Sequence, residues 1–303
     1  MTARDKKTAA GAFCIRFPNP KEEQHVKIRS SKLLMVALAL MIGSAGMTQA
    51  AVAKAAPASD PSVAAEKKDA TGKFQKKHEE FLQRGKAGPI GVLFLGDSIT
   101  EGWIKATNVW ATFYKQFDAA NFGIGGDRTE HVLWRIANGE LDGIHPKVVV
   151  LMIGTNNTGS NDADQIAAAD KKIVKEIQAK LPDTKILLLA VFPRGPRPPS
   201  APKPVAAAPG AKPAKPAAPK PVVSAQAMAE DAAKRMAIIN AVNKELAKLD
   251  DGKKVRYLDI NPKFLGTDGK IPNDVMPDQL HPNAKGYQIW ADAMQPLLAE
   301  MLK

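Results

Sequence analysis

Residues 91–100 read GVLFLGDSIT, an apolar run that ends in small and polar residues. The run 91–95 is almost continuously apolar, which is typical of a parallel strand covered on both faces. Further runs of this kind and the helical patterns between them predict five strands, each followed by a helix. The expected strands are 91–95, 119–122, 148–153, 186–192 and 255–260, and the expected helices are 109–117, 128–137, 163–180, 228–249 and 284–302. This alternation predicts an open, doubly wound α/β sheet whose function lies at the carboxyl ends of its strands.

The composition is that of a globular protein, with 303 residues of which 45% are hydrophobic and 24% charged. The net charge of +12 is concentrated in residues 1–50 and 196–223, so the remainder of the chain is nearly neutral. A nucleic-acid-binding face needs basic charge clustered on the folded body, and the sequence therefore argues against a nucleic-acid partner. The single cysteine, Cys14, excludes an internal disulfide and a zinc site made of several thiolates.

The N-terminal region has the pattern of a secretory signal peptide. Residues 33–50 follow three basic residues and combine an apolar run with small residues near Ala50 that suit cleavage. A membrane anchor is the alternative, but the apolar run is short for a bilayer span. We therefore expect an N-terminal extension and signal peptide over 1–50, a flexible linker over 51–72, and a mature protein that is secreted or periplasmic.

Residues 196–223 interrupt the alternation of strands and helices. They contain ten Pro, eight Ala and four Lys, a composition that cannot bury enough apolar surface to fold and favours extended polyproline II. We expect a solvated, disordered insertion within one catalytic domain that spans 73–303. The alternative is a basic arm that makes weak contacts with anionic cell-wall polymers.

Polar motifs follow the predicted strands. Ser98 lies at a strand-to-helix turn, where a nucleophile would be exposed, although Gly-Asp-Ser is also an ordinary turn and helix-cap sequence. Residues 121–127, NFGIGGD, contain three glycines whose N–H groups can face a ligand. Asn156 follows the third strand and can donate to an oxyanion or tie a turn. Asp278 and His281 are spaced so that the carboxylate can accept from imidazole Nδ1–H, or the pair can belong to a helix-capping loop.

Two common catalytic or binding signatures are missing from the sequence. No Gly-x-Ser-x-Gly elbow occurs, and the dinucleotide-binding fingerprint fails because Arg128 stands where its third glycine belongs. Asp127 and Arg128 are expected to brace the glycine loop, or else to contact substrate. Taken together, the motifs supply a nucleophile, oxyanion donors and an oriented base, which is a set for acyl transfer that needs no metal or organic cofactor.

The stretch NFGIGGDRTEHVLWRIANGEL at 121–141, followed by GTNN at 154–157, resembles the SGNH (GDSL) hydrolase superfamily. Within it, the stretch is similar to the catalytic subunits of platelet-activating-factor acetylhydrolases and their secreted bacterial relatives. The resemblance covers about residues 75–195 and 228–302. The expected fold is therefore a flavodoxin-like α/β/α sandwich around a doubly wound, five-stranded parallel sheet.

The resemblance also implies roles for individual residues. It implies Ser98 as the nucleophile and Asp278 with His281 as the rest of a catalytic triad. It further implies that the Ser98 N–H, Gly126 and Asn156 form the oxyanion hole.

Ile99, Thr155 and Leu280 each adjoin a catalytic residue and are bulky or β-branched. We expect them to wall a small acyl pocket, unless they point into the core and leave the acyl side open. The expected function is a secreted serine esterase that removes acetyl groups, first of all O-acetyl groups of carbohydrates, because exported enzymes meet acetylated polysaccharides. The alternatives are a lysophospholipase or thioesterase, a platelet-activating-factor-like acetylhydrolase, and a non-catalytic carbohydrate- or cell-wall-binding protein.

Overall fold

A computed structural model describes residues 60–197 and 223–303, and the expected signal peptide and most of the Pro/Ala/Lys insertion lie outside these residues. Five strands in the described part form one parallel sheet in the order β2-β1-β3-β4-β5. The strands are β1 (Val92–Gly96), β2 (Ala120–Gly123), β3 (Val148–Met152), β4 (Lys185–Leu189) and β5 (Val255–Leu258). The order steps outward from β1 in both directions, as in a doubly wound sheet, so the predicted fold class is confirmed.

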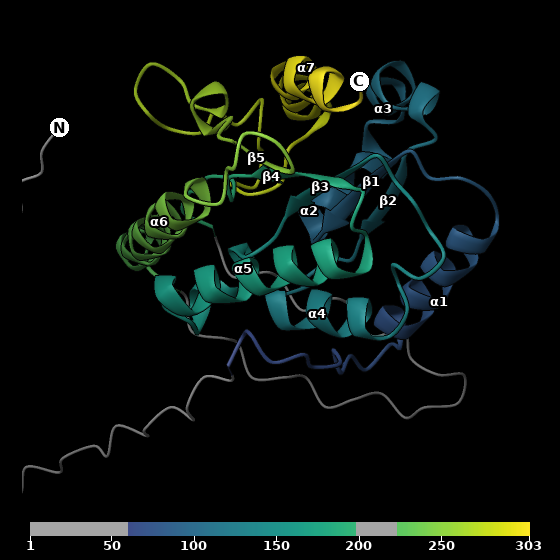
Figure 1. The fold of residues 1–303 in the computed structure, drawn as a ribbon. Helices are drawn as coiled ribbons and strands as arrows, with labels where there is room; N and C mark the ends of the chain where they lie inside the picture. Colours follow the sequence, from purple (N-terminus) through teal and green to yellow (C-terminus); the bar gives the residue numbers. More distant parts are fainter. Residues whose placement is uncertain (1–59, 198–222) are drawn as a thin grey trace, which may run out of the picture. The chain divides into compact units, whose positions relative to one another are not determined.

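Helices cover both faces of the sheet (Figure 1). Helices α1, α4, α5 and α6 pack on one face, and α3 and α7 pack on the other. The helices are α1 (Lys73–Lys86), α2 (Ser98–Glu101), α3 (Thr107–Phe113), α4 (Thr129–Ala137), α5 (Ala163–Lys180), α6 (Ala225–Ala247) and α7 (Ala284–Met301). Helix α5 has the predicted bounds, whereas the helix predicted over 109–117 begins earlier and ends at Phe113, followed by a short 3₁₀ turn.

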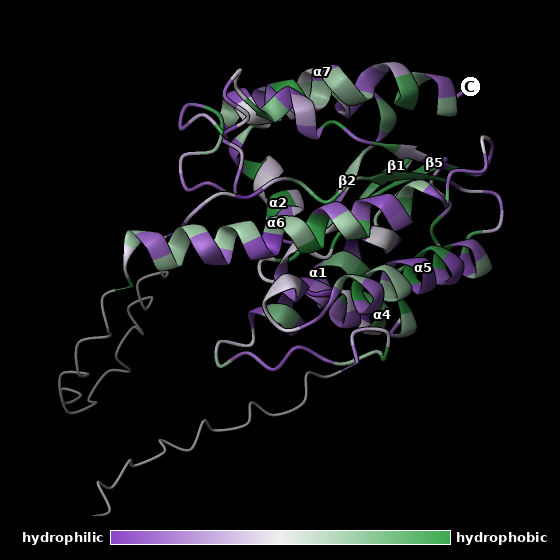
Figure 2. Cartoon of the chain, turned by 90° about the vertical axis from the view of Figure 1, so that its left-hand side faces the viewer, coloured by the Kyte–Doolittle hydropathy of each residue, from purple (hydrophilic) through white to green (hydrophobic). Residues whose placement is uncertain are grey.

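The sheet separates two apolar cores, because successive side chains of a strand point to opposite faces. Leu93 and Leu95 of β1 pack in the core under α1, α4, α5 and α6, and Val92 and Phe94 pack in the core under α3 and α7. Figure 2 shows the apolar strands enclosed by helices whose outer faces are hydrophilic. Burial of each such side chain contributes about 1.5–3 kcal/mol, so the sheet provides a rigid frame for the loops at its carboxyl edge.

Local sequence signals fix where the helices begin. Asp162 caps α5 by accepting a hydrogen bond at 2.9 Å from the Gln165 N–H, and Gln165 Oε1 accepts in return from the Asp162 N–H at 3.2 Å. This reciprocal capping box satisfies two backbone donors that the first helical turn leaves free. The Asn283 side chain caps α7 by accepting from the Gly286 N–H at 3.1 Å, and so α7 begins three positions after the predicted catalytic histidine.

Residues 60–72, which belong to the expected linker, lie against the catalytic domain. The Thr129 hydroxyl donates to the Pro61 carbonyl at 3.0 Å, and the Ala65 N–H donates to the Glu130 carbonyl at 3.1 Å. These two hydrogen bonds hold the segment against the start of α4. In the two described ranges, no helix has both the length and the apolar character needed to cross a bilayer.

Candidate active site

Ser98 and His281 meet at the carboxyl edge of the sheet. Ser98 begins α2 directly after β1, and its Oγ lies 2.9 Å from His281 Nε2. His281 Nδ1 lies 2.7 Å from Asp278 Oδ2. A serine hydroxyl that donates to Nε2 requires the hydrogen on Nδ1, which then faces the carboxylate. The three predicted residues thus form one continuous hydrogen-bonded chain in which the imidazole can accept the serine proton.

A tight turn aligns Asp278 with His281. Asp278 Oδ1 accepts hydrogen bonds from the backbone N–H groups of Leu280 at 3.2 Å and His281 at 2.8 Å. Gln279 has a φ of 60°, a left-handed conformation that costs a non-glycine residue about 1–2 kcal/mol. The Gly195 N–H donates to the Gln279 carbonyl at 2.8 Å and so ties this turn to the loop after β4.

Arg197 is a second partner of the triad carboxylate. Its Nη2 lies 2.8 Å from Asp278 Oδ2, the oxygen that also faces the imidazole. Partial burial of Asp278 opposes ionisation, but the hydrogen bonds from the backbone and ring of His281, with the charge of Arg197, outweigh it and lower the pKa of Asp278. Asp278 is therefore ionised and able to stabilise an imidazolium. No sequence motif points to Arg197, which is 81 positions away from Asp278.

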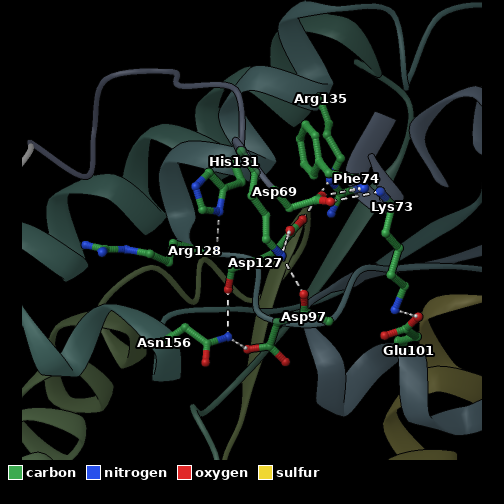
Figure 3. Close-up of polar contacts among 12 residues, drawn as sticks. Asp69, Lys73, Phe74, Asp97, Glu101, Asp127, Arg128, His131, Arg135 and Asn156 are labelled. Atoms are coloured by element: carbon green, nitrogen blue, oxygen red, sulfur yellow. Dashed lines mark hydrogen bonds and ion pairs between the residues drawn. The ribbon is translucent and has the colours of Figure 1, made fainter. Parts of the chain in front are cut away.

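The predicted oxyanion donors Gly126 and Asn156 belong to the loops that follow β2 and β3. Gly126 has a φ of 77°, which only glycine adopts without strain. Asn156 Nδ2 donates to the Asp127 carbonyl at 2.8 Å and to Asp97 Oδ2 at 3.3 Å, as Figure 3 shows. Gly126 and Asn156 both line the cleft that contains Ser98. The longer bond is the one to Asp97 Oδ2. An oxyanion in this cleft would compete with Asp97 for that amide hydrogen of Asn156.

A buried ion-pair network holds the glycine loop, residues 121–127, in position. Arg135 is fully buried, and its Nε lies 3.0 Å from Asp127 Oδ2 while its Nη1 contacts the Glu140 carboxylate. The same guanidinium donates to the Phe122 carbonyl at 3.2 Å and the Gly96 carbonyl at 3.3 Å. Arg135 therefore joins the ends of β1 and β2, and removal of one buried ionic partner typically costs about 3–5 kcal/mol. Asp127 acts in the structure as the expected brace.

Asp97, the residue before the serine, is also buried. Its Oδ1 accepts from the Ile99 N–H at 2.9 Å and caps α2. Burial raises the pKa of Asp97 to about 7, against the opposing effect of the Ile99 N–H. Asp97 thus connects the nucleophile turn to Asn156 across the ends of β1 and β3.

Lys67 reaches the glycine loop from the segment before α1. Its Nζ contacts the Gly125 carbonyl and lies 3.4 Å from Asp127 Oδ1. A Cβ atom on Gly126 would lie 3.3 Å from the same Nζ. Nothing in the sequence singles out Lys67 among the lysines of its neighbourhood, because 58 positions separate it from Gly125.

Ser98 and His281 open into a cleft of about 1030 Å³. Of the three residues expected to wall an acyl pocket, the structure places Leu280 on this cleft. Ile99 and Thr155 are fully buried in the protein and are not among the described residues that line it. Most of the non-glycine side chains that line the cleft are polar or charged. In the described ranges, no group of three or more His, Cys, Asp or Glu is arranged to hold a metal ion.

Residues 94–289, which include the whole hydrogen-bonded chain, match the model of the GDSL-like Lipase/Acylhydrolase family. The chain belongs to this family. It is therefore a carboxylic ester hydrolase, and the family expected from its motifs is confirmed.

Relatives of known name and structure agree with the family assignment. The human platelet-activating factor acetylhydrolase IB subunit alpha1 is 30% identical over 231 residues, which cover 76% of this chain and 85% of that protein. The alpha2 subunit from Rattus norvegicus is 32% identical over 241 residues, covering 79% and 90%. A GDSL-like lipase from Bacteroides thetaiotaomicron shares the fold with a TM-score of 0.50 and 19% identity, over 74% of this chain and 97% of that one.

Proposed function

We propose that the protein is a serine esterase that removes short acyl groups, chiefly acetyl, through Ser98, His281 and Asp278. The observation that carries this proposal is the chain of short contacts from Ser98 Oγ through the imidazole to Asp278, which opens into the large cleft. The names of the acetylhydrolase relatives support acetyl as the acyl group.

The proposed reaction has two halves. In the first, His281 Nε2 takes the Ser98 proton as Oγ attacks the ester carbonyl, and Asp278 stabilises the imidazolium. The Ser98 and Gly126 N–H groups and the Asn156 amide hold the tetrahedral oxyanion, and His281 then protonates the leaving alcohol. In the second half, water attacks the acyl-enzyme with His281 again as base, and acetate leaves as Ser98 recovers its proton.

We further propose that the alcohol part of the substrate is a carbohydrate. The cleft supports this choice because most of its non-glycine lining side chains are polar or charged and offer hydrogen-bonding groups to hydroxyls. A platelet-activating-factor-like acetylhydrolase is the second candidate, and the names of the relatives favour it. The signal-peptide pattern of residues 33–50 supports a secreted or periplasmic location.

Acetate release from a panel of esters tests the proposal. The panel contains acetylated xylan, acetylated pectin, acetylated peptidoglycan, an acetyl glycerophospholipid and p-nitrophenyl acetate. We expect release from p-nitrophenyl acetate and from at least one polysaccharide, and loss of both in Ser98→Ala. Release from the phospholipid alone would favour the second candidate. Activity that survives Ser98→Ala would contradict the serine mechanism.

A further inference from the structure

Three arginines line one wall of the active-site cleft. Arg194 and Arg197 follow β4, and Arg235 lies on α6; we refer to them as the arginine cluster. They line the same cleft as Ser98 and His281. The proposed esterase mechanism uses none of the three as a reacting group.

Two members of the cluster have a carboxylate partner. Arg197 donates to Asp278 at 2.8 Å, and Arg235 Nε lies 2.7 Å from Asp231 Oδ2. Their charges are therefore partly neutralised by the protein itself.

Arg194 has no such partner among the described residues. Its Nη1 has only long contacts with Thr155, 3.4 Å to the carbonyl and 3.5 Å to Oγ1, and its buried Nε makes no hydrogen bond there. Burial, together with the charges of Arg235 and Arg197, lowers the pKa of Arg194 to about 10. A guanidinium that is partly buried among like charges is unfavourable until an anion approaches it.

The other acids of the cleft are engaged elsewhere. Glu101 pairs with Lys73 at 2.8 Å, and Asp69 accepts from the backbone N–H groups of Thr71, Lys73 and Phe74 (Figure 3). The cleft therefore has an excess of positive charge on the wall that Arg194 occupies.

We propose that the arginine cluster, and Arg194 above all, binds an anionic group on the alcohol part of the ester. The inference rests on the proposed function, because an acetyl group carries no charge and the anion must then belong to the alcohol. Guanidinium groups bind carboxylates and phosphates through paired, charge-assisted hydrogen bonds. The substrate class is therefore an acetyl ester of an acidic alcohol, such as a sugar acid or a phosphate-bearing polyol.

A pair of esters that differ in charge tests the subsite. 4-Acetoxybenzoate carries a carboxylate on its alcohol part, and methyl 4-acetoxybenzoate is its neutral counterpart. The measured quantity is the ratio of kcat/KM for acetate release from the charged and neutral esters, taken within each variant of the full chain. This ratio cancels a general loss of activity or folded protein. In Arg194→Gln we expect the ratio to fall roughly tenfold or more, the effect of one charge-assisted hydrogen bond.

Arg256→Gln is the matched control. Arg256 lies on β5, pairs with Glu300 at 3.0 Å and is not among the described residues that line the cleft. The Arg256→Gln variant loses the same charge at a position outside the proposed subsite. Its ratio of kcat/KM on the charged and neutral esters should therefore equal that of the wild type. An equal fall in both variants, or no fall in Arg194→Gln, would overturn the proposal.

Two further measurements identify the preferred anion and separate binding from turnover. 4-Acetoxyphenyl phosphate replaces the carboxylate, and a larger Arg194 effect on it than on the benzoate would identify phosphate as the preferred anion. Calorimetric titration of 4-acetoxybenzoate into Ser98→Ala, with and without Arg194→Gln, measures binding without turnover. If the wild type cleaved neither ester, the proposed function would fail. If Ser98→Ala bound 4-acetoxybenzoate equally well with and without Arg194→Gln, the anion subsite would be rejected independently of the proposed function.

Discussion

Ser98 and His281 are 183 positions apart in the chain, yet their reacting atoms lie 2.9 Å apart. At the residue scale this contact predicts a specific pattern of mutant kinetics. Ser98→Ala and His281→Ala should each lower kcat on p-nitrophenyl acetate by at least about a thousandfold, and the double variant should be no worse than either single one. Residues that act as one catalytic unit are non-additive in this way.

Kinetics of the three variants, each checked for native circular dichroism, measure this pattern. If the losses in the two single variants multiplied in the double variant, Ser98 and His281 would act independently and the triad assignment would be wrong.

A second prediction at the scale of residues concerns Asp170 of α5 and the pH dependence of the free energy of unfolding. Its carboxyl is fully buried next to Gly154, and neither oxygen has a hydrogen-bond partner among the described residues. Burial alone raises the pKa of Asp170 well above its ordinary value. A raised folded pKa means that the unfolded chain releases this proton first, so the native state loses stability as pH rises above about 4.

Asp170→Asn should therefore unfold at higher denaturant concentration than the wild type at pH 7 but at a similar concentration at pH 4. The difference in unfolding free energy should grow by about 1.4 kcal/mol per pH unit above pH 4, until the folded pKa is reached. Urea titrations at several pH values measure it. A constant difference across pH would show that Asp170 is not a buried neutral acid.

At the scale of elements, the segment 60–72 places one lysine on the glycine loop, residues 121–127. Lys67 Nζ contacts the Gly125 carbonyl, whereas the neighbouring Lys68 is exposed and pairs with Glu66. We expect Lys67→Met to lower kcat on p-nitrophenyl acetate roughly tenfold with little change in KM, because a displaced oxyanion donor weakens transition-state binding more than substrate binding. Lys68→Met removes the same charge and should leave kcat unchanged.

Lys67→Arg retains the charge and a donor, so it should recover part of the lost rate. Equal kcat for Lys67→Met and Lys68→Met would show that the segment contributes only packing to the domain.

At the scale of the whole molecule, an acyl-chain preference can be predicted from the cleft. Leu280 lines it, but Ile99 and Thr155 are buried, so the structure does not supply the closed acyl pocket expected from the sequence. Polar and charged side chains make up most of the non-glycine lining of the cleft, and added methylenes gain little beside them of the roughly 0.8 kcal/mol that each obtains on apolar burial. We therefore expect kcat/KM on p-nitrophenyl esters to fall from acetyl through butyryl to octanoyl.

The same series in the presence of a constant, non-inhibitory detergent concentration separates chain preference from substrate aggregation. A rise in kcat/KM from acetyl to octanoyl would instead indicate an apolar path for the acyl tail and a lipase- or thioesterase-like preference.

The sequence by itself was enough to predict the fold and the residues now found in the hydrogen-bonded chain. Apolar periodicity is a local property, so five runs and the helices between them predict a doubly wound sheet. Parallel strands bring their carboxyl ends to one edge, and this rule places Ser98, Gly126 and Asn156 together without a calculation of contacts. The spacing of Asp278 and His281 is also local, and a single turn aligns them.

Only the tertiary structure decided which distant side chains reach this edge and which adjacent ones turn away from it. Arg197 and Lys67 meet the site across 81 and 58 positions, and no local pattern encodes a contact over such distances. Ile99 and Thr155 adjoin site residues in sequence but are buried, since neighbouring side chains point in different directions from the backbone. The surroundings of Arg194 are non-local too. The loop after β4 packs against α6, where the Arg194 N–H contacts Met236, and this packing brings Arg194 close to the charges of Arg235 and Arg197.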